Sequence, residues 1–249
     1  FGDAPAAPVT THPTGMNFPW NDWQAEKWLT VLGYQSGHGD DAKTWRWLHS
    51  GPPAEFGKAK TFARPVINLE PPYEGHNGYQ SKKPHSDFSV RRAVYWSLLN
   101  APTAGVTYGG HGVWSWHTKP GEPPTDHPGT GPAKTWKDAL DLPGAKQAGY
   151  ARKLFESVPW TELRPAQDLL APPDPTDDAT EYLACAATPD RGVVVLYLPN
   201  GLPTKFAKPF EKAVRLNWFD PRTGVFHGAN SYGVTTDSKS KDMVLVLRQ

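Results

Sequence analysis

Four short apolar runs in the first 160 residues are each followed directly by glycine, aromatic or hydrogen-bonding residues. The runs are Pro8–Thr11, Leu29–Tyr34, Arg64–Leu69 and Gly105–Tyr108. They are continuous rather than alternating, which is typical of strands buried on both faces of a parallel sheet. Because parallel strands end at one edge of a sheet, the polar residues that follow them should meet there. This pattern restricts the fold to a (β/α) barrel or an open, doubly wound sheet.

Helical patterns separate these runs. Asp40 and Asp41 predict an N-cap for a helix over 42–49 that ends before Gly51, and Ser86 predicts one for a helix over 88–99. A third helix is predicted over 144–157, after a proline. Alternation of strands and helices predicts a parallel α/β domain.

The barrel interpretation is favoured over a nucleotide-binding fold. No Gly-x-Gly-x-x-Gly and no Gly-x-x-x-x-Gly-Lys-Ser/Thr motif occurs. However, a full barrel takes ~250 residues and eight strands, and four strands are only half of one. Half a barrel leaves two open sheet edges and an uncovered apolar face. We therefore expect either that the chain is the C-terminal portion of a longer protein or that another chain completes the barrel.

The composition changes near residue 160. Ten of the 11 Trp and eight of the nine His lie at or before Trp160, and two proline-rich stretches follow. Beyond them, apolar runs at 180–187, 192–198, 213–219 and 242–248 are separated by turn signals, which predicts a small antiparallel β-sandwich without helices. We therefore expect a partial barrel over 1–160, a linker over 161–175 and the β-sandwich over 176–249.

Charge and cysteine content exclude several classes of protein. Lys+Arg 26 against Asp+Glu 25 gives a net charge of +1, without the basic excess of a nucleic-acid-binding protein. No apolar run approaches the ~18 residues of a membrane-spanning helix. The single cysteine, Cys185, excludes an intrachain disulfide and a cysteine-based zinc site, and its apolar neighbours predict that it is buried.

Glu70 is the strongest candidate for catalysis. It ends the third apolar run, and Pro71 and Pro72 follow it directly. A carboxylate held rigidly at a strand end suits attack on an oxocarbenium-like centre, and Glu74 could supply a second carboxylate. An equally weighted alternative is that Glu70 only accepts hydrogen bonds and forms a salt bridge with Arg91 or Arg92.

Histidines and tryptophans form a second group of candidates. His12, His38 and His111 each follow a different apolar run, but no His-x-x-x-His or His-Glu-x-x-His spacing exists, so hydrogen-bonding or structural roles are favoured over a metal site. No cofactor is expected. Trp114 and Trp116 alternate along an extended segment and could stack on sugar rings. Five other tryptophans are predicted to pack in the core: Trp20, Trp23, Trp28, Trp45 and Trp47.

These motifs together are similar to those of a known family. The segments 65–75, 91–96 and 107–116 resemble the apiosidase-like glycoside hydrolases, and His12-Pro13 and the segment 35–38 also resemble elements of that family. The segment 217–224 resembles a C-terminal domain labelled collagen-binding domain of a collagenase. The matches run from about residue 8 to the end of the chain.

The resemblance implies a (β/α)₈ barrel followed by a β-sandwich, in which the four strands are the fifth to the eighth. It implies that Glu70 is the catalytic nucleophile and that the acid/base is an aspartate in a Gly-Gly-Asp segment after the fourth strand. Only eight residues separate Asp3 from His12, too few for a parallel crossover, so the acid/base is missing from this chain. The substrate-binding candidates are His12, Gln35, His38, Tyr73, Glu74, Tyr108, His111, Trp114 and Trp116.

Three hypotheses follow. The chain is the C-terminal portion of a glycoside hydrolase that acts on plant or microbial polysaccharide side chains, and is inactive alone; or the missing half is a separate polypeptide; or the chain is a non-catalytic module that binds polysaccharide or collagen. We expect a carbohydrate substrate, no nucleic-acid or membrane partner, and a secreted or periplasmic location. The sugar, the linkage and the stereochemical outcome are left open.

Overall fold

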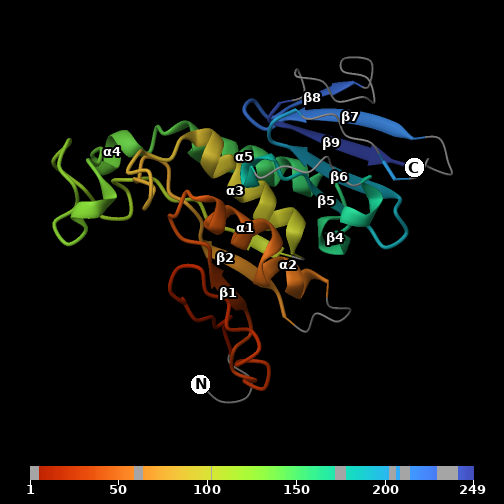
Figure 1. The fold of residues 1–249 in the computed structure, drawn as a ribbon, viewed down its shortest axis with the longest axis horizontal. Helices are drawn as coiled ribbons and strands as arrows, with labels where there is room; N and C mark the ends of the chain where they lie inside the picture. Colours follow the sequence, from red (N-terminus) through yellow and green to blue (C-terminus); the bar gives the residue numbers. More distant parts are fainter. Residues whose placement is uncertain are drawn as a thin grey trace.

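A parallel sheet and an antiparallel sheet, with helices between them, form the described part of the chain (Figure 1). The computed structural model describes residues 6–58, 64–101, 103–171, 178–201, 206–207, 214–228 and 241–249. The elements are β1 (Leu32–Gln35), α1 (Ala42–Ser50), α2 (Pro52–Gly57), β2 (Val66–Glu70), α3 (Asp87–Asn100), β3 (Thr103–Val106), η1 (Pro128–Thr130), α4 (Trp136–Ala139), α5 (Pro143–Glu156), η2 (Trp160–Glu162), β4 (Arg164–Pro165), η3 (Gln167–Leu169), η4 (Ala179–Glu181), β5 (Ala184–Ala187), β6 (Val193–Leu198), β7 (Arg215–Asp220), β8 (Val225–Gly228) and β9 (Met243–Arg248).

The parallel sheet has the order β1-β2-β3. Leu32 of β1 pairs with Val66 of β2, and Ile67 of β2 pairs with Gly105 of β3. Three of the four predicted strands are therefore present, with ends displaced by one to three residues. Because the strands are parallel, their carboxyl ends lie at one edge of the sheet, where the predicted polar residues follow them.

The predicted strand at Pro8–Thr11 is wrong. The segment runs beside β1, but only Val9 bonds to the backbone there: its carbonyl accepts from the amides of Thr30 and Val31, both at 3.0 Å. Proline at positions 8 and 13 removes two amide donors, so a regular ladder does not continue along the segment.

The three predicted helices are confirmed, and two of them begin at the predicted N-caps. The Asp41 carboxylate accepts from the Thr44 amide at 2.8 Å and starts α1, which ends at Gly51. The Ser86 hydroxyl accepts from the Ser89 amide at 3.2 Å and starts α3. Helix α5 begins at Pro143, whose missing amide N–H would be unpaired in the first turn of a helix.

Helix α3 lies between the two sheets and is buried on nearly all sides (Figure 1). It contacts β3 on one side and β5 and β6 on the other. The Tyr95 ring stacks on the Tyr197 ring with a centroid distance of 4.8 Å, and Trp96 Nε1 donates to the Tyr182 carbonyl at 3.0 Å. One hydrophobic cluster consequently extends from the parallel sheet through α3 to the antiparallel sheet.

The antiparallel sheet has the order β4-β5-β6-β9-β7-β8. The central strands β6 and β9 are buried on both faces. Helix α3 packs on one face, and on the other face Trp218 and Leu245 of the sheet belong to a second cluster with Ala166, Leu169, Leu170 and Phe206. The four predicted runs correspond to β5, β6, β7 and β9, but β8 was not predicted. Within the described ranges all strands after residue 163 fall into this one sheet.

The first half of the predicted linker is ordered against this sheet. Strand β4 pairs with β5, and the Ala166 amide donates to the Cys185 carbonyl at 2.8 Å. Cys185 is fully buried, as predicted, and burial raises the pKa of its thiol to about 12. Residues 172–175 of the linker lie outside the described residues. The helices in the described ranges are all too short or too polar to traverse a lipid bilayer.

Candidate active site

Glu70 ends β2, the middle strand of the parallel sheet, and its carboxylate is held by two histidines. His38 Nε2 lies 2.7 Å from Glu70 Oε1, and His12 Nε2 lies 3.3 Å from Glu70 Oε2. The Glu70 side chain is 20 % exposed, whereas that of His38 is 4 % exposed and that of His12 is 51 % exposed. The carboxylate is thus fixed from the buried side and remains accessible from the other side.

A glycine turn brings His38 to Glu70. Gln35, the last residue of β1, pairs with Glu70 after a register shift, and the Gly37 amide donates to the Glu70 carbonyl at 2.9 Å. Gly37 has a φ of +74°, a conformation that other residues adopt only with strain. The chain therefore reverses directly after β1 and places the His38 ring against the end of β2.

The hydrogen bonds of His38 define its tautomer. The Tyr73 amide donates to His38 Nδ1 at 3.4 Å, so Nδ1 carries a lone pair and Nε2 carries the proton that is donated to Glu70. Glu70 accepts this bond as a carboxylate. The hydrogen bond from His38 lowers the pKa of Glu70 below its ordinary value, electrostatic interaction with the imidazoles of His38 and His12 adds to this, and partial burial opposes it.

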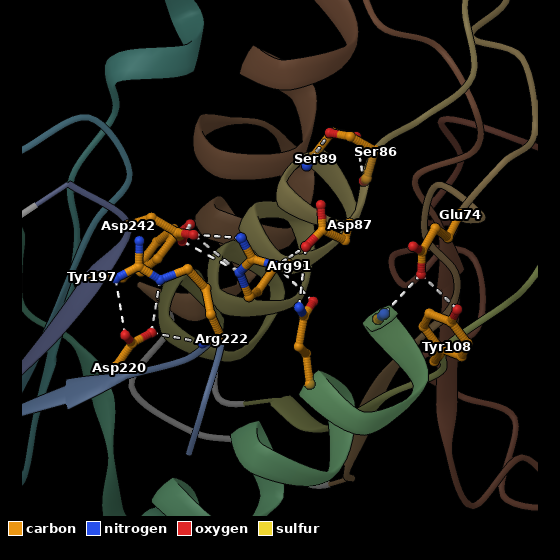
Figure 2. Close-up of polar contacts among 12 residues, drawn as sticks. Glu74, Ser86, Asp87, Ser89, Arg91, Tyr108, Tyr197, Asp220, Arg222 and Asp242 are labelled. Atoms are coloured by element: carbon orange, nitrogen blue, oxygen red, sulfur yellow. Dashed lines mark hydrogen bonds and ion pairs between the residues drawn. The ribbon is translucent and has the colours of Figure 1, made fainter. Parts of the chain in front are cut away.

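The alternative in which Glu70 pairs with Arg91 or Arg92 is wrong. Arg91 bonds instead to Asp87 and Asp242, on the side of α3 that faces the antiparallel sheet (Figure 2). The Arg92 guanidinium lies over three aromatic rings, with centroid distances of 4.7 Å to Trp45, 5.0 Å to Trp96 and 5.3 Å to Phe88.

Aromatic rings surround the His38–Glu70 pair. The His76 ring stacks on His38 at 4.1 Å and 25°, and the Tyr73 and Tyr79 rings approach His38 edge-on at 4.6 and 5.8 Å. Burial, followed by electrostatic interaction with the neighbouring His38, lowers the pKa of His76 to about 3, so His76 is neutral at physiological pH. Burial and the nearby Glu70 charge raise the pKa of Tyr73 to about 12.

His111 and Trp114 continue this row of rings. The His111 ring lies 5.4 Å from that of His76 and 6.1 Å from that of Trp114. His111 Nε2 donates to the Gly131 carbonyl at 2.8 Å, and its Nδ1 accepts from Trp114 Nε1 at 3.3 Å. Both ring nitrogens are therefore engaged within the protein, and 38 % of Trp114 is exposed.

Glu74 and Tyr108 face helix α5. Glu74 Oε2 accepts from the Tyr108 hydroxyl and from the Gly144 amide in the first turn of α5, each at 2.8 Å (Figure 2). A carboxylate at this position is favoured by the helix dipole and by the free amides of the first turn. Burial raises the pKa of Glu74. These contacts tie both residues to α5, while the contacts of Glu70 tie it to the histidines.

A buried polar network supports the strand that carries Glu70. Asn68 Nδ2 donates to the hydroxyls of Ser36 and Ser97 at 3.0 and 2.9 Å. The network links the ends of β1 and β2 to helix α3 and limits the freedom of the residues just before Glu70. His85 Nε2 also donates to the His38 carbonyl at 3.0 Å, which fixes the backbone of the histidine that binds Glu70.

His76, Tyr79 and His85 are the site residues that the sequence did not predict. All three lie in the loop between β2 and α3, six to 15 residues after Glu70. The signal that points to them is the density of histidine and tyrosine in the loop that follows the candidate nucleophile. Trp116, which was predicted, is displaced from this row: 64 % of it is exposed and its ring stacks on Trp136.

No group of three or more metal-ligating side chains is found within the described ranges. His38 and His111 each use both ring nitrogens in hydrogen bonds to the protein, so neither offers a free lone pair to a cation. The core role predicted for the other tryptophans is confirmed: Trp45 is buried, and Trp20, Trp23, Trp28 and Trp47 are partly buried against the main hydrophobic cluster.

Comparison of the sequence with protein families identifies the family of the part of the chain that carries this site. The model of the apiosidase-like catalytic domain matches residues 2–162, about two thirds of the chain. The chain belongs to the apiosidase-like family. No curated protein matches the sequence.

Solved structures agree with the family in fold. A structure titled glycoside hydrolase has 23 % identity and a TM-score of 0.76, with 97 % of this chain and 57 % of the other covered. A glycoside hydrolase family 5 structure from Bacteroides vulgatus has 22 % identity and a TM-score of 0.73, with 97 % and 56 % covered. This apiosidase-like chain thus has a mixed α/β glycoside-hydrolase-like fold, and it spans little more than half the length of those proteins.

Proposed function

We propose that this chain is the C-terminal part of a glycoside hydrolase in which Glu70 is the nucleophile. The observation that carries the proposal is the state of the Glu70 carboxylate: it is held ionised by His38 and His12 at the carboxyl end of a parallel strand and is still partly exposed. Its proposed substrate is a side chain of a plant or microbial polysaccharide.

The direction of the pKa shift separates the two roles of a glycosidase carboxylate. A general acid needs a raised pKa in order to remain protonated, whereas a nucleophile must be ionised and unblocked. The lowered pKa of Glu70 therefore argues against the general-acid role and fits the nucleophile, although the general base of an inverting enzyme would be ionised as well. A nucleophile in turn implies a retaining mechanism, with the partner carboxyl group ~5–5.5 Å away.

The partner acid/base is proposed to be an aspartate supplied by the half of a (β/α)₈ barrel that this chain lacks. Asp3, the acidic residue excluded on spacing, lies outside the described residues. A cavity of about 350 Å³ supports completion of the barrel next to β3. It is lined by Gly105 and Val106 of β3, Val94 of α3, and Ala151 and Phe155 of α5. The first strand of a closed barrel would lie beside β3.

Several residues are proposed to bind the sugar. His12 contacts Glu70 Oε2, Gln35 pairs with Glu70 along the sheet, and the Tyr73 ring packs on His38. Trp114 offers a partly exposed ring, while His111, which is buried and bonded through both nitrogens, is assigned to holding Trp114 in place. Because Glu74 and Tyr108 bond to each other and to α5, we assign them to positioning the loop after β2 rather than to the sugar.

The domain division and the location remain proposals. We propose a partial barrel over 1–160 and a β-sandwich over 176–249, with the described antiparallel sheet as one of its two sheets. A secreted or periplasmic location fits a polymeric substrate, which does not enter cells.

Chemical rescue tests the role of Glu70. In the longer protein that contains the completed barrel, we expect Glu70→Ala to lower turnover of aryl glycosides on the order of 10³-fold or more. Azide should restore part of this activity and give a glycosyl azide of inverted configuration, because azide takes the place of the missing carboxylate. Glu74→Gln is the matched control and should keep most of the activity. Full activity of Glu70→Ala, or turnover by the 249-residue chain alone, would refute the proposal.

A further inference from the structure

Two stacked tryptophans lie on the surface of the segment that follows β3. The Trp116 and Trp136 rings are nearly parallel, with a centroid distance of 4.3 Å and an angle of 12°. Trp136 begins α4, which lies at the end of the molecule opposite the antiparallel sheet (Figure 1). One face of Trp116 is covered by Trp136, yet 64 % of the residue is exposed, so its other face is open to solvent.

The backbone holds Trp116 in a strained conformation. Its φ is +50°, in the left-handed region that bulky residues rarely adopt. Three backbone bonds fix the segment: Trp116 N to the Val113 carbonyl at 3.0 Å, His117 N to the Gly112 carbonyl at 2.9 Å, and Trp136 N to the His117 carbonyl at 2.7 Å. Strain of this kind persists only where the surrounding structure imposes it, and it often accompanies a functional site. The exposed ring is therefore held in place before any ligand binds.

The stacked pair follows the ring row of the candidate active site closely in the chain, although Trp116 is displaced from that row. Consecutive ring contacts lead from the Glu70 partner His38 to His76 at 4.1 Å, from His76 to His111 at 5.4 Å, and from His111 to Trp114 at 6.1 Å. Trp114 and Trp116 are two residues apart and both are exposed. The rings of His38, His76 and His111 are buried, and the exposed aromatic side chains that follow them are Trp114 and Trp116.

We infer that the Trp116–Trp136 pair is a distal subsite that binds a sugar ring of a polymeric glycan while another part of the same glycan reaches Glu70. This inference rests on the proposed function and deepens it, since it requires a substrate of several sugar units. An indole face packs against the apolar C–H face of a sugar ring, as it packs against other apolar surfaces. The neighbouring Lys137, whose Nζ lies 5.5 Å from the Trp136 ring centre, can donate hydrogen bonds to sugar hydroxyls.

The size of the surface favours a glycan over a protein partner. A stable protein interface buries about 800 Å² on each side. Two partly exposed indoles offer much less area than this. Most of the residues between Trp116 and Trp136 are exposed, and most of these are polar or proline. A single sugar ring, by contrast, needs only one aromatic face and a few hydrogen-bonding groups around it.

Affinity electrophoresis tests the subsite directly. The 249-residue chain is run in native gels with and without neutral polysaccharides, namely arabinoxylan, galactomannan and highly methyl-esterified pectin. We expect at least one of them to retard the chain. Trp116→Ala should weaken that retention about tenfold or more, and Trp116→Tyr should restore most of it because a flat aromatic face returns. Trp160→Ala is the matched control, since Trp160 is also 40 % exposed but lines the cavity beside β3 and α5.

The outcomes separate this inference from the proposed nucleophile. Glu70→Gln should keep full retention, because binding at the Trp116–Trp136 pair does not need the nucleophile. The inference is overturned if no polysaccharide retards the parent chain, if Trp116→Ala and Trp160→Ala reduce retention equally, or if Trp116→Tyr restores nothing. Self-association that Trp116→Ala abolishes, without retention by any polysaccharide, would assign the pair to a protein interface instead.

Discussion

The ion pair between Arg91 and Asp242 should contribute strongly to the stability of this chain, because it is buried between helix α3 and the antiparallel sheet. The two side chains are 4 % and 6 % exposed. Arg91 Nε donates to Asp242 Oδ2 at 3.1 Å, and Nη2 bonds to the same oxygen. The Tyr197 hydroxyl donates to Asp242 Oδ1 at 2.9 Å, so the carboxylate accepts from both α3 and β6 (Figure 2).

The substitution Asp242→Asn removes the charge and preserves the volume. The Arg91 guanidinium would then keep two partners, both at Nη1. These are Asp87 Oδ2 at 2.8 Å, on a side chain that is 35 % exposed, and the Gln147 amide oxygen at 2.6 Å. Breaking a buried pair by removing one partner costs about 3–5 kcal/mol, because the other charge stays buried without full compensation. At ~2–4 °C per kcal/mol for a chain of this size, Tm should fall by roughly 6–20 °C.

Urea unfolding followed by tryptophan fluorescence, together with a thermal scan by circular dichroism, measures the loss. Glu156→Gln is the matched control: Arg152 Nε lies 2.7 Å from Glu156 Oε1, but the Glu156 and Arg152 side chains are 55 % and 78 % exposed. The control should leave the free energy of unfolding nearly unchanged, because solvent-exposed ion pairs contribute little to stability. If Asp242→Asn stays within 1 kcal/mol of the parent chain, the burial argument is wrong.

Two further predictions concern buried groups near the site and in the core. Tyr108→Phe removes one of the two hydrogen bonds to the Glu74 carboxylate and should lower the free energy of unfolding, measured by urea titration, by about 1–3 kcal/mol. The glycosidase activity of the longer protein should remain. A loss of activity as large as that of Glu70→Ala would show that Glu74 acts on substrate. Burial lowers the pKa of His49 to about 4 and that of His76 to about 3. The unfolded chain therefore takes up these protons first, and the free energy of unfolding should fall as the pH drops below about 6.5, by up to ~1.4 kcal/mol per pH unit for each histidine. His49→Phe should flatten this slope between pH 6.5 and 5, and an unchanged slope would refute the assignment.

Local signals in the sequence predicted the elements that depend on local contacts. The caps at Asp41 and Ser86 lie within three residues of the amides they bind, so the starts of α1 and α3 could be read directly. The segment Pro8–Thr11 has the composition of a strand, but Pro8 and the nearby Pro13 lack the amide donors that a regular ladder needs, and composition alone does not reveal this. The short strand β8 follows the predicted turn that ends at Gly224, and only its pairing with β7 makes it a strand.

The sequence predicted the residues at the centre of the site, but not the rings packed around them. Glu70 and His38 each follow a buried strand, and parallel pairing brings such positions together, so their contact follows from the topology. The stacking of His76 on His38 depends on the path of the loop after β2, which no pattern of spacing encodes. Glu74 looked like a second carboxylate because it lies four residues after Glu70, but the chain turns at Gly75 and directs it to α5.

The position of helix α3 has a consequence for how this protein can be divided. Tyr95 and Trp96 have no exposed surface because Tyr197 and Tyr182, from beyond the proline-rich stretch, cover them. Cutting the chain at that stretch would expose two large aromatic side chains to water, and we expect the resulting fragment to aggregate. The sequence boundary near residue 160 therefore marks where the architecture changes, and a fragment meant for catalysis or crystallisation should keep both sides of it.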